Sequence, residues 1–294
     1  MRDPGRLLVC ATPIGNLGDV TLRVLDALRD SDLIAAEDTR VTSKLLARYE
    51  IATPIERFDE NVATRKAPLL VDRMLAGETI ALVSDAGTPG VSDPGARLVE
   101  AAVEAGVPVE ALPGASALLA ALVSSGLPMR HFYFAGFLPR KAGERDALLD
   151  RLADLDATLV FYESPKRTAA TLSVLARRFP GRRAAMAREL TKLHEEVARD
   201  EIGELAAALK DRPLKGEVVL LIGPPHAAEH SSADESEIAA LVADLVAGGF
   251  SRKDAIKQVA ADSGLPRNDV YRIAHKGPEA GAPAPADADS GPDT

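Results

Sequence analysis

The chain has 294 residues, of which 46% are hydrophobic, and a formal net charge of −9 at pH 7. A chain of this length and composition can bury a large core, which excludes an intrinsically disordered protein and allows one large domain or two medium ones. The excess of acidic residues argues against a protein wrapped in nucleic acid, because counterion release needs many Lys or Arg side chains on phosphates. Any contact with a nucleic acid must therefore be a local basic patch.

Membrane, metal and redox functions are also disfavoured. No uninterrupted apolar run approaches the roughly 20 residues that span a bilayer, and residues 1–5 are too polar for a signal peptide. The only cysteine, Cys10, cannot form an internal disulfide, and the histidines lack metal-ligand spacing. We expect a cytoplasmic protein without a metal site.

Short β-rich runs alternate with amphipathic helical stretches, a pattern that predicts an α/β fold. The first predicted strand, residues 6–10, runs into a Gly/Pro loop and then into a helix at 21–29. Further strands are predicted at 33–36, 79–84 and 107–112, with helices at 98–105 and 117–124. Three strands run directly into glycine-bearing loops, so we expect these loops at the carboxyl edge of one sheet, where ligands bind in open α/β folds.

The pattern changes near residues 132–141, where aromatic residues precede a basic end and a second domain is expected to begin. Strands are predicted at 158–163, 184–188 and 217–222, with a helix at 167–178. The predicted organisation is an N-terminal α/β domain at 1–115, a second α/β domain at 116–224, a linker at 225–235, a helical extension at 236–277 and a disordered tail at 278–294. Residues 251–254 have the form of a capping box.

Glycine-rich loops after strands usually indicate a nucleotide, but the standard phosphate motifs are absent. The chain has no P-loop signature, and residues 15–18 lack the third glycine of a dinucleotide fingerprint. Ser116 stands in PGASA, not in the G-x-S-x-G of serine hydrolases. The loops combine Gly, Pro, Ser and Asp, which suits a small zwitterionic ligand carrying adenosine. From residues alone, simple tight turns explain them equally well.

The specific sequences of the loops go further. Residues 11–19 (ATPIGNLGD), 37–40 (EDTR) and 84–90 (SDAGTPG) closely resemble the tetrapyrrole methylase superfamily, and within it the bacterial 16S ribosomal RNA 2′-O-methyltransferases that modify cytidine 1402. Further matches are PGAS at 113–116, FAGFLPRK at 134–141, YESPKR at 162–167, ARELTK at 187–192 and KGE at 215–217. The first loop departs from the Gly-Pro-Gly run of the tetrapyrrole enzymes and agrees with the ribosomal RNA branch.

The resemblance implies two α/β domains with S-adenosylmethionine in the cleft between them, and a homodimer. It also implies 16S ribosomal RNA as the partner, within the small ribosomal subunit, and methylation of the cytidine 1402 ribose. The residues that it implies for the cofactor lie in the matched loops: Pro13, Gly15, Ser84, Asp85, Ala86, Gly87, Ala115, Ser116, Glu163 and Gly216.

A ribose hydroxyl is a poor nucleophile at neutral pH, so a nearby group must accept its proton. The candidates in the matched loops are Asp38, Glu163, Lys166, Glu189 and Lys192. A lysine can act as the base only if its surroundings lower its pKa, and Asp38 has the structural alternative of pairing with Arg40. The sequence does not rank these candidates.

Cations beside the matched loops are expected to hold RNA phosphates without reading the base: Arg140, Lys141, Lys166, Arg167 and Arg188. The helical extension is also locally basic, which fits either an accessory RNA contact or packing against the main body. Two other functions share these features, a tetrapyrrole methylase and a non-catalytic ribosome-assembly factor. The first loop argues against the former, and the presence of every matched loop argues against the latter.

Overall fold

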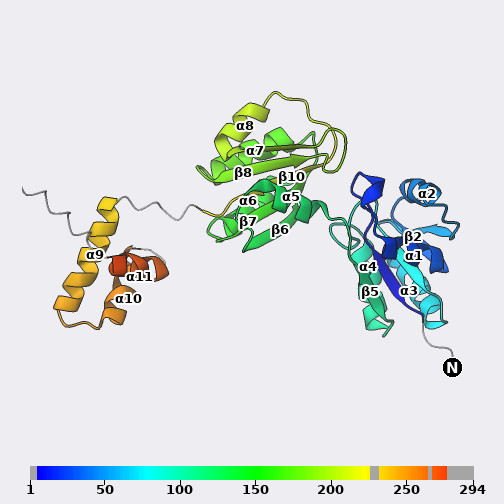
Figure 1. The fold of residues 1–294 in the computed structure, drawn as a ribbon, viewed down its shortest axis with the longest axis horizontal. Coiled ribbons are helices and arrows are strands. Elements are labelled where there is room, and N and C mark those ends of the chain that lie inside the picture. Colours follow the sequence, from blue (N-terminus) through cyan, green and yellow to red (C-terminus); the bar gives the residue numbers. More distant parts are fainter. Residues whose placement is uncertain (1–4, 226–231, 264–266, 277–294) are drawn as a thin grey trace, which may run out of the picture. The chain divides into compact units, whose positions relative to one another are not determined.

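The computed structural model describes residues 5–225, 232–263 and 267–276 (Figure 1). The chain divides into two compact units, Met1–His226 and Ala227–Thr294. Among the described helices, none has the length and apolar character needed to cross a membrane. The first unit contains two five-stranded sheets with helices between their strands, which confirms the predicted α/β class.

The first sheet is entirely parallel, with the strand order β3-β2-β4-β1-β5. Its strands are β1 (Leu7–Cys10), β2 (Leu33–Ala36), β3 (Ile55–Arg57), β4 (Ile80–Val83) and β5 (Val109–Leu112). Strands β1, β2 and β4 are buried along their whole length, because helices cover both faces of the sheet. These helices are α1 (Leu22–Asp30), α2 (Thr39–Arg48), α3 (Ala63–Leu75) and α4 (Gly95–Glu104).

Alternate residues of each central strand face different helical layers. Leu8 of β1 packs in one apolar cluster with Val24 of α1, whereas Leu7 packs in another with Met74 of α3. Since all five strands are parallel, their carboxyl ends lie at one edge. The glycine-bearing loops that follow β1, β4 and β5 therefore meet there, as predicted from the sequence, and the loop after β2 joins them.

The second sheet is mixed, with the order β6-β7-β10-β8-β9. Strand β6 (Phe132–Phe137) runs parallel to β7 (Thr158–Glu163), and the other pairs are antiparallel. The remaining strands are β8 (Arg183–Arg188), β9 (Glu196–Glu201) and β10 (Val218–Ile222). Helices α6 (Ala142–Leu152), α7 (Thr168–Arg178) and α8 (Ile202–Leu209) cover one face.

Helix α5 (Ala117–Ser125) covers the other face of the second sheet. Ile14, from the loop after β1, is buried in the same cluster with Leu122 of α5 and Val219 of β10. The loop that leaves the first sheet is thus packed into the core of the second. This contact joins the two sheets within one unit.

The second unit is a helical bundle of α9 (Ser232–Ala247), α10 (Arg252–Ser263) and α11 (Arg267–Lys276). Its apolar core includes Ile238, Val242, Ile256, Val259, Val270 and Ile273. Helix α9 begins at Ser232, before the predicted start at 236, and residues 226–231 of the predicted linker lie outside the described residues. The side chain of Ser251 accepts a hydrogen bond from the backbone N–H of Asp254 at 3.1 Å, as a capping box requires. The predicted tail at 278–294 lies outside the described residues.

Candidate functional site

The loops after β1 and β4 are joined by an antiparallel backbone bridge. Thr12 and Gly87 exchange both hydrogen bonds, at 2.9 and 3.0 Å, and the Thr12 hydroxyl donates to the carbonyl of Ser84 at 3.0 Å. Gly87 has a φ of +84°, and a Cβ there would lie 3.3 Å from Ile14. A larger residue would be strained and crowded, so glycine is needed to close this bridge.

Two cavities open on either side of the joined loops. The small cavity, about 200 Å³, lies between the loop after β1 and α2, and Lys192 and Glu217 of the second sheet also line it. The large cavity, about 440 Å³, lies between the carboxyl edge of the first sheet and strands β7 and β10 of the second. Ser84, Asp85 and Ala86 line both cavities, so the loop after β4 separates them.

Most residues implied for the cofactor line one of these cavities. Pro13 and Gly15 line the small cavity. Gly87, Ser116, Glu163 and Gly216 line the large one. Ala115 is the exception, since it lines neither, although its carbonyl accepts a hydrogen bond from Thr88 at 3.3 Å. The structure therefore brings together loops that lie about two hundred residues apart in sequence, since Thr12 and Glu217 line the same cavity.

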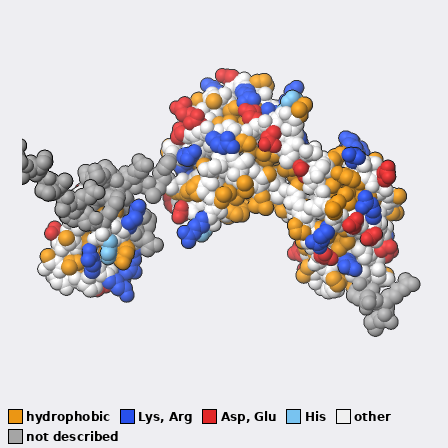
Figure 2. All heavy atoms as spheres, viewed as in Figure 1, with side chains coloured by type: hydrophobic (Ala, Val, Ile, Leu, Met, Phe, Trp, Pro, Cys, Tyr) orange, Lys and Arg blue, Asp and Glu red, His pale blue; other side chains and the backbone are white. Residues whose placement is uncertain are grey.

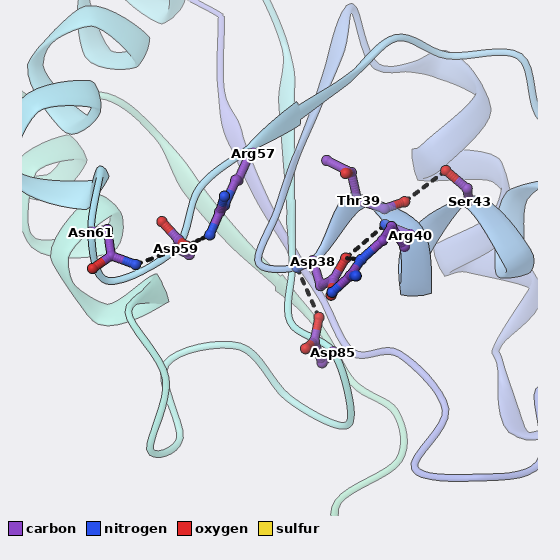
Figure 3. A network of polar contacts seen from close by, with 8 residues as sticks. All are labelled: Asp38, Thr39, Arg40, Ser43, Arg57, Asp59, Asn61 and Asp85. Carbon is purple, nitrogen blue, oxygen red and sulfur yellow. Dashed lines mark hydrogen bonds and ion pairs between the residues drawn. The ribbon is translucent and has the colours of Figure 1, made fainter.

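Acidic residues at the carboxyl ends of β2 and β4 form a hydrogen-bonded chain (Figure 3). The Asp38 amide donates to Asp85 Oδ1 at 2.9 Å, and the Asp85 amide donates to Glu37 Oε2 at 3.2 Å. Asp38 also pairs with Arg40, whose Nη2 lies 2.6 Å from Oδ2. Figure 3 shows Asp38 between Arg40 and Asp85, with a separate pair of Arg57 and Asp59 nearby.

The pKa values of the carboxyl groups in this hydrogen-bonded series are shifted in opposite directions. Hydrogen bonds from the side chain and backbone of Arg40 lower the pKa of Asp38 to about 2, which makes it a weak base. Burial raises the pKa of Glu37 and of Asp85 above their ordinary values, and neighbouring carboxylates add to the effect. Both of these raised groups face the large cavity. The structure therefore gives Asp38 the ion-pair role and leaves its neighbours as the more basic carboxylates.

Lys192 ties the second sheet to the first loop. Its Nζ lies 2.9 Å from Glu189 Oε1 and 3.2 Å from Glu217 Oε2. Its stem packs against Gly15, where an added Cβ would lie 2.4 Å from Lys192 Cγ. Partial burial disfavours the charge, but hydrogen bonds and charges from the two glutamates outweigh it and raise the pKa of Lys192. A lysine with a raised pKa is protonated at neutral pH, so the structure disfavours Lys192 as a base.

Two residues of the loop between β8 and β9 have unusual backbone conformations. Glu189 and Thr191 have φ values of 50° and 65°, in the left-handed region that non-glycine residues rarely adopt. The Thr191 hydroxyl accepts a hydrogen bond from the backbone N–H of Asn16 at 3.1 Å. Strain of this kind persists only where surrounding contacts enforce it. Here those contacts include ones to the first loop and to Lys192.

Glu163 lies at the end of β7 with only 3% of its surface exposed. Its carboxylate accepts hydrogen bonds from the Thr171 hydroxyl at 2.6 Å and from the Ser164 amide at 2.7 Å. Arg167 Nη2 lies 3.4 Å from the same carboxylate and donates to the Leu138 carbonyl at 3.0 Å. These contacts occupy both oxygens of Glu163, so the geometry favours a role in shaping the cavity wall.

The predicted RNA-binding cations differ in their availability. Arg188 Nη2 is paired with Glu196 at 3.0 Å, and Lys141 with Glu144 at 3.0 Å. Arg140 and Lys166 are exposed, and neither side chain has an ion pair or hydrogen bond with the described residues. Lys166 directly follows Pro165, which lines the large cavity. Arg140 and Lys166 are therefore the cations most open to an external phosphate.

Several lining residues were not identified as site residues from the sequence. Glu37 and Glu217 each stand beside a predicted site residue, Asp38 and Gly216, in the same matched motif. Their position next to these residues could have indicated them. Phe137 and Tyr162 are also inside matched motifs, but their aromatic side chains carry no signal that distinguishes a cavity wall from a core. Thr42 of α2 carries no sequence signal and reaches the small cavity only through the fold.

A profile of the family described as Tetrapyrrole (Corrin/Porphyrin) Methylases matches residues 6–206. Curated proteins named Ribosomal RNA small subunit methyltransferase I are similar along most of the chain. The protein of that name from Halalkalibacterium halodurans is 42% identical over 93% of this chain and 96% of its own length. The Synechocystis protein is 45% identical over 92% of this chain and 97% of its own.

Solved structures share the fold at lower identity. CobJ, a methyltransferase, has a TM-score of 0.57 at 24% identity and covers 75% of this chain and 94% of its own. Uroporphyrin-III C-methyltransferase from Thermus thermophilus, complexed with S-adenosyl homocysteine, has a TM-score of 0.54 at 22% identity and covers 74% of this chain and 97% of its own. At these identities the likeness shows the fold alone.

The Lys192 cluster generates a prediction about stability. Replacing Lys192 with Gln leaves Glu189 and Glu217 facing each other without a cation, so the free energy of unfolding should fall by about 1 kcal/mol at pH 7. Denaturant titration measures this difference. Lys215→Gln is the matched control, because Lys215 is in the same region and its side chain forms no ion pair with the described residues.

The difference in the free energy of unfolding between the wild type and Lys192→Gln should depend on pH. The folded-state pKa of Glu189 is lowered from 4.5, chiefly by its hydrogen bond with Lys192, so the pair's contribution is present above 4.5 and lost as the pH falls through the lowered value. The pKa of Lys192 is raised from 10.5, so the contribution is also lost at strongly alkaline pH. A difference that stayed constant below pH 4 would contradict the pairing.

Proposed function

Because this chain belongs to the tetrapyrrole (corrin/porphyrin) methylase family, we propose that it transfers a methyl group from S-adenosylmethionine to small-subunit ribosomal RNA. The observation that carries this proposal is the identity of 42–45% to proteins named for that reaction, over nearly the full length of both chains. The acceptor is the ribose 2′-oxygen of cytidine 1402 in 16S ribosomal RNA, as the loop motifs imply. The enzyme acts in the cytoplasm, on RNA within the small ribosomal subunit.

The chemistry of the large cavity fits S-adenosylmethionine. This cofactor carries an ammonium and a sulfonium cation, and Asp93 provides a carboxylate on the cavity wall in addition to those of Glu37 and Asp85. Its adenine needs an apolar surface, which Val91 and Val218 supply. Gly87 keeps side-chain atoms away from the narrowest approach of the joined loops.

S-adenosylmethionine supplies an already activated methyl group, so the protein mainly has to align the acceptor oxygen and exclude water. The cavity walls from both sheets would hold the ribose in that alignment. A carboxylate that faces the large cavity accepts the 2′-hydroxyl proton during attack. Glu37 and Asp85 are suited to this step, because burial makes them more basic than an exposed carboxylate.

The helical unit offers a second surface for RNA. Arg252, Lys253 and Lys257 of α10 and Arg267 of α11 are all exposed. Figure 2 shows Lys and Arg side chains gathered on this unit, although the whole chain is acidic. We propose that these cations hold RNA phosphates and that the unit adds affinity without contributing to cofactor binding.

A homodimer is also part of the proposal. Helix α5 (ALLAALVSS) is apolar on all sides, and a helix of this kind is normally buried. Leu119 and Val123 are nevertheless 52% and 68% exposed. Figure 2 shows hydrophobic side chains gathered over the region where Figure 1 draws α5. A second copy of the chain is the occupant that would bury this face.

We predict that the purified protein binds one S-adenosylmethionine per chain and methylates small-subunit RNA on ribose. Calorimetry measures the first property. Nuclease digestion and nucleoside mass analysis measure the second, because a 2′-O-methylated nucleoside carries the added mass on its sugar. Gly87→Val should weaken cofactor binding by about tenfold or more, since the side chain would crowd Ile14 and disfavour the backbone conformation.

Turnover should also fall as the pH decreases through the raised pKa values of Glu37 and Asp85, because the proton acceptor must be ionised.

Gly143→Val is the control for Gly87→Val, since a Cβ at Gly143 meets no atom within 4 Å. Added mass on the free base would show the acceptor atom to be wrong. Absence of cofactor binding by folded protein would remove the methyltransferase proposal.

For the helical unit, we predict that deleting residues 227–294 leaves cofactor affinity within about twofold and weakens RNA binding. The double substitution Lys253→Gln and Lys257→Gln in the full chain should reduce the slope of log affinity against log salt by roughly one to two, as expected for lost phosphate contacts. Filter binding at several salt concentrations measures this slope. Unchanged slopes would indicate that the unit does not contact RNA.

For the dimer, we predict that Leu119→Glu combined with Val123→Glu converts a dimer into a folded monomer. Light scattering gives the mass, and circular dichroism checks the fold. Leu22→Glu, at a leucine of α1 that is 79% exposed, should leave the dimer intact. A wild-type protein that is monomeric at micromolar concentration would overturn the proposal.

A further inference from the structure

Strand β6 contains a β-bulge that redirects one aromatic side chain. Phe134 pairs with Val160 of β7, and Phe137 pairs with Tyr162, so three steps along β6 match two along β7. Gly136, with a φ of +65°, lies inside this bulge. In a regular strand, residues 134 and 137 would face opposite sides of the sheet, and an inserted residue removes that alternation.

The result is a cluster of three rings, with Tyr162 between Phe134 and Phe137 in contact with both. Phe134 lies edge-on to Tyr162 with ring centroids 4.8 Å apart, and Phe137 lies edge-on with centroids 5.7 Å apart. Both phenylalanines therefore lie against the same ring. The two ring planes are inclined at 64°, and this contact holds Phe137 in a defined orientation relative to Tyr162.

Phe137 differs from the other two rings in its exposure. Phe134 and Tyr162 are half-buried in the apolar core beneath α5, whereas Phe137 is 54% exposed and lines the large cavity with Tyr162. Isolated exposed hydrophobic residues are common on protein surfaces. This one is oriented by a bulge and lies on the wall of the proposed active site, which gives it a ligand-binding geometry.

The acceptor nucleotide needs such a surface. A cavity of about 440 Å³ that also holds a cofactor cannot accommodate paired and stacked RNA, so the nucleotide must enter singly. Enzymes that extract a nucleotide lose its stacking on neighbouring bases and replace it with aromatic side chains. An aromatic ring at the cavity wall compensates for that loss.

We propose that Phe137, oriented by the bulge and by Tyr162, is the platform on which the base of the acceptor nucleotide stacks while its ribose enters the large cavity. The proposal rests on the ribosomal RNA function given above and names the residue that positions its substrate. Arg140, three residues further along the chain, and Lys166, next to Pro165 of the cavity wall, are exposed cations available for the flanking phosphates. Stacking, in contrast to these phosphate contacts, holds the base itself.

The absence of tryptophan from the chain allows a direct test of stacking. Phe137→Trp places the chain's only tryptophan at the platform, and its indole can be excited selectively over the four tyrosines. Its emission should be quenched by a single-stranded oligoribonucleotide with a central cytidine, and much less by the same strand with an abasic site at that position. Leu155→Trp is the matched control, because Leu155 is 38% exposed and precedes β7 at the end opposite the cavity.

A kinetic test separates stacking from cofactor binding. Phe137→Leu keeps an apolar side chain but removes the ring, so kcat/KM for the RNA should fall about tenfold or more. Cofactor affinity, measured by calorimetry without RNA, should stay within about twofold of the wild-type value. Phe137→Tyr should restore most of the activity, since a phenol ring offers the same stacking face.

Equal quenching by the abasic strand, or an unchanged kcat/KM in Phe137→Leu, would overturn the proposal. Weakened cofactor binding in Phe137→Leu would also overturn it, because the ring would then support the cofactor's adenine. If the wild-type enzyme methylated no ribosomal RNA, the proposed function would fail. The fluorescence comparison would still decide whether Phe137 stacks a base, since it requires no turnover.

Discussion

The backbone bridge between Thr12 and Gly87 is the constraint on which the site depends. Parallel strands bring their carboxyl ends to one edge, but the loops that leave β1 and β4 would diverge there, because the helices that follow lie on opposite faces of the sheet. Two hydrogen bonds hold these loops together and fix Ser84, Asp85 and Ala86 between the two cavities. The bridge requires a positive φ at residue 87, and Gly87 adopts it without a steric penalty because it has no Cβ.

The first loop also connects the two sheets. Ile14 is buried beneath α5, Asn16 donates to Thr191, and Gly15 packs against the stem of Lys192. The site is therefore shaped by contacts from both sheets, and each sheet supplies part of the cavity wall. Strained conformations at Glu189 and Thr191 are held by this junction. Transfer from an activated methyl donor depends mainly on the alignment of the acceptor oxygen. Cavity walls that are fixed to one another maintain this alignment better than walls that move independently.

Charge is distributed unevenly around the cavities. Carboxylates gather at the carboxyl edge of the first sheet, where burial raises the pKa of Glu37 and Asp85. Exposed cations lie on the side of the second sheet, after β6 and β7. The proposed cofactor carries positive groups and the proposed substrate carries phosphates, so the two walls match the two ligands. An acidic protein can thus bind RNA through a small number of local cations, as the composition requires.

The sequence by itself determined the α/β class, the strands at 33–36 and 158–163 with their observed bounds, and the loops that line the site. It did so because short apolar runs and glycine-bearing turns are local signals, and because loop motifs indicated the family. The short strand β3 and the charged edge strand β9 were not predicted, since Ile55–Arg57 and Glu196–Glu201 lack apolar alternation. Only the tertiary structure decided which side chains are free. Asp38 is neutralised as a base by Arg40, Arg188 is held by Glu196, and Phe137 is turned into the cavity by a bulge. Pairing and exposure depend on neighbours that are distant in sequence or set by backbone geometry, and no local pattern specifies them.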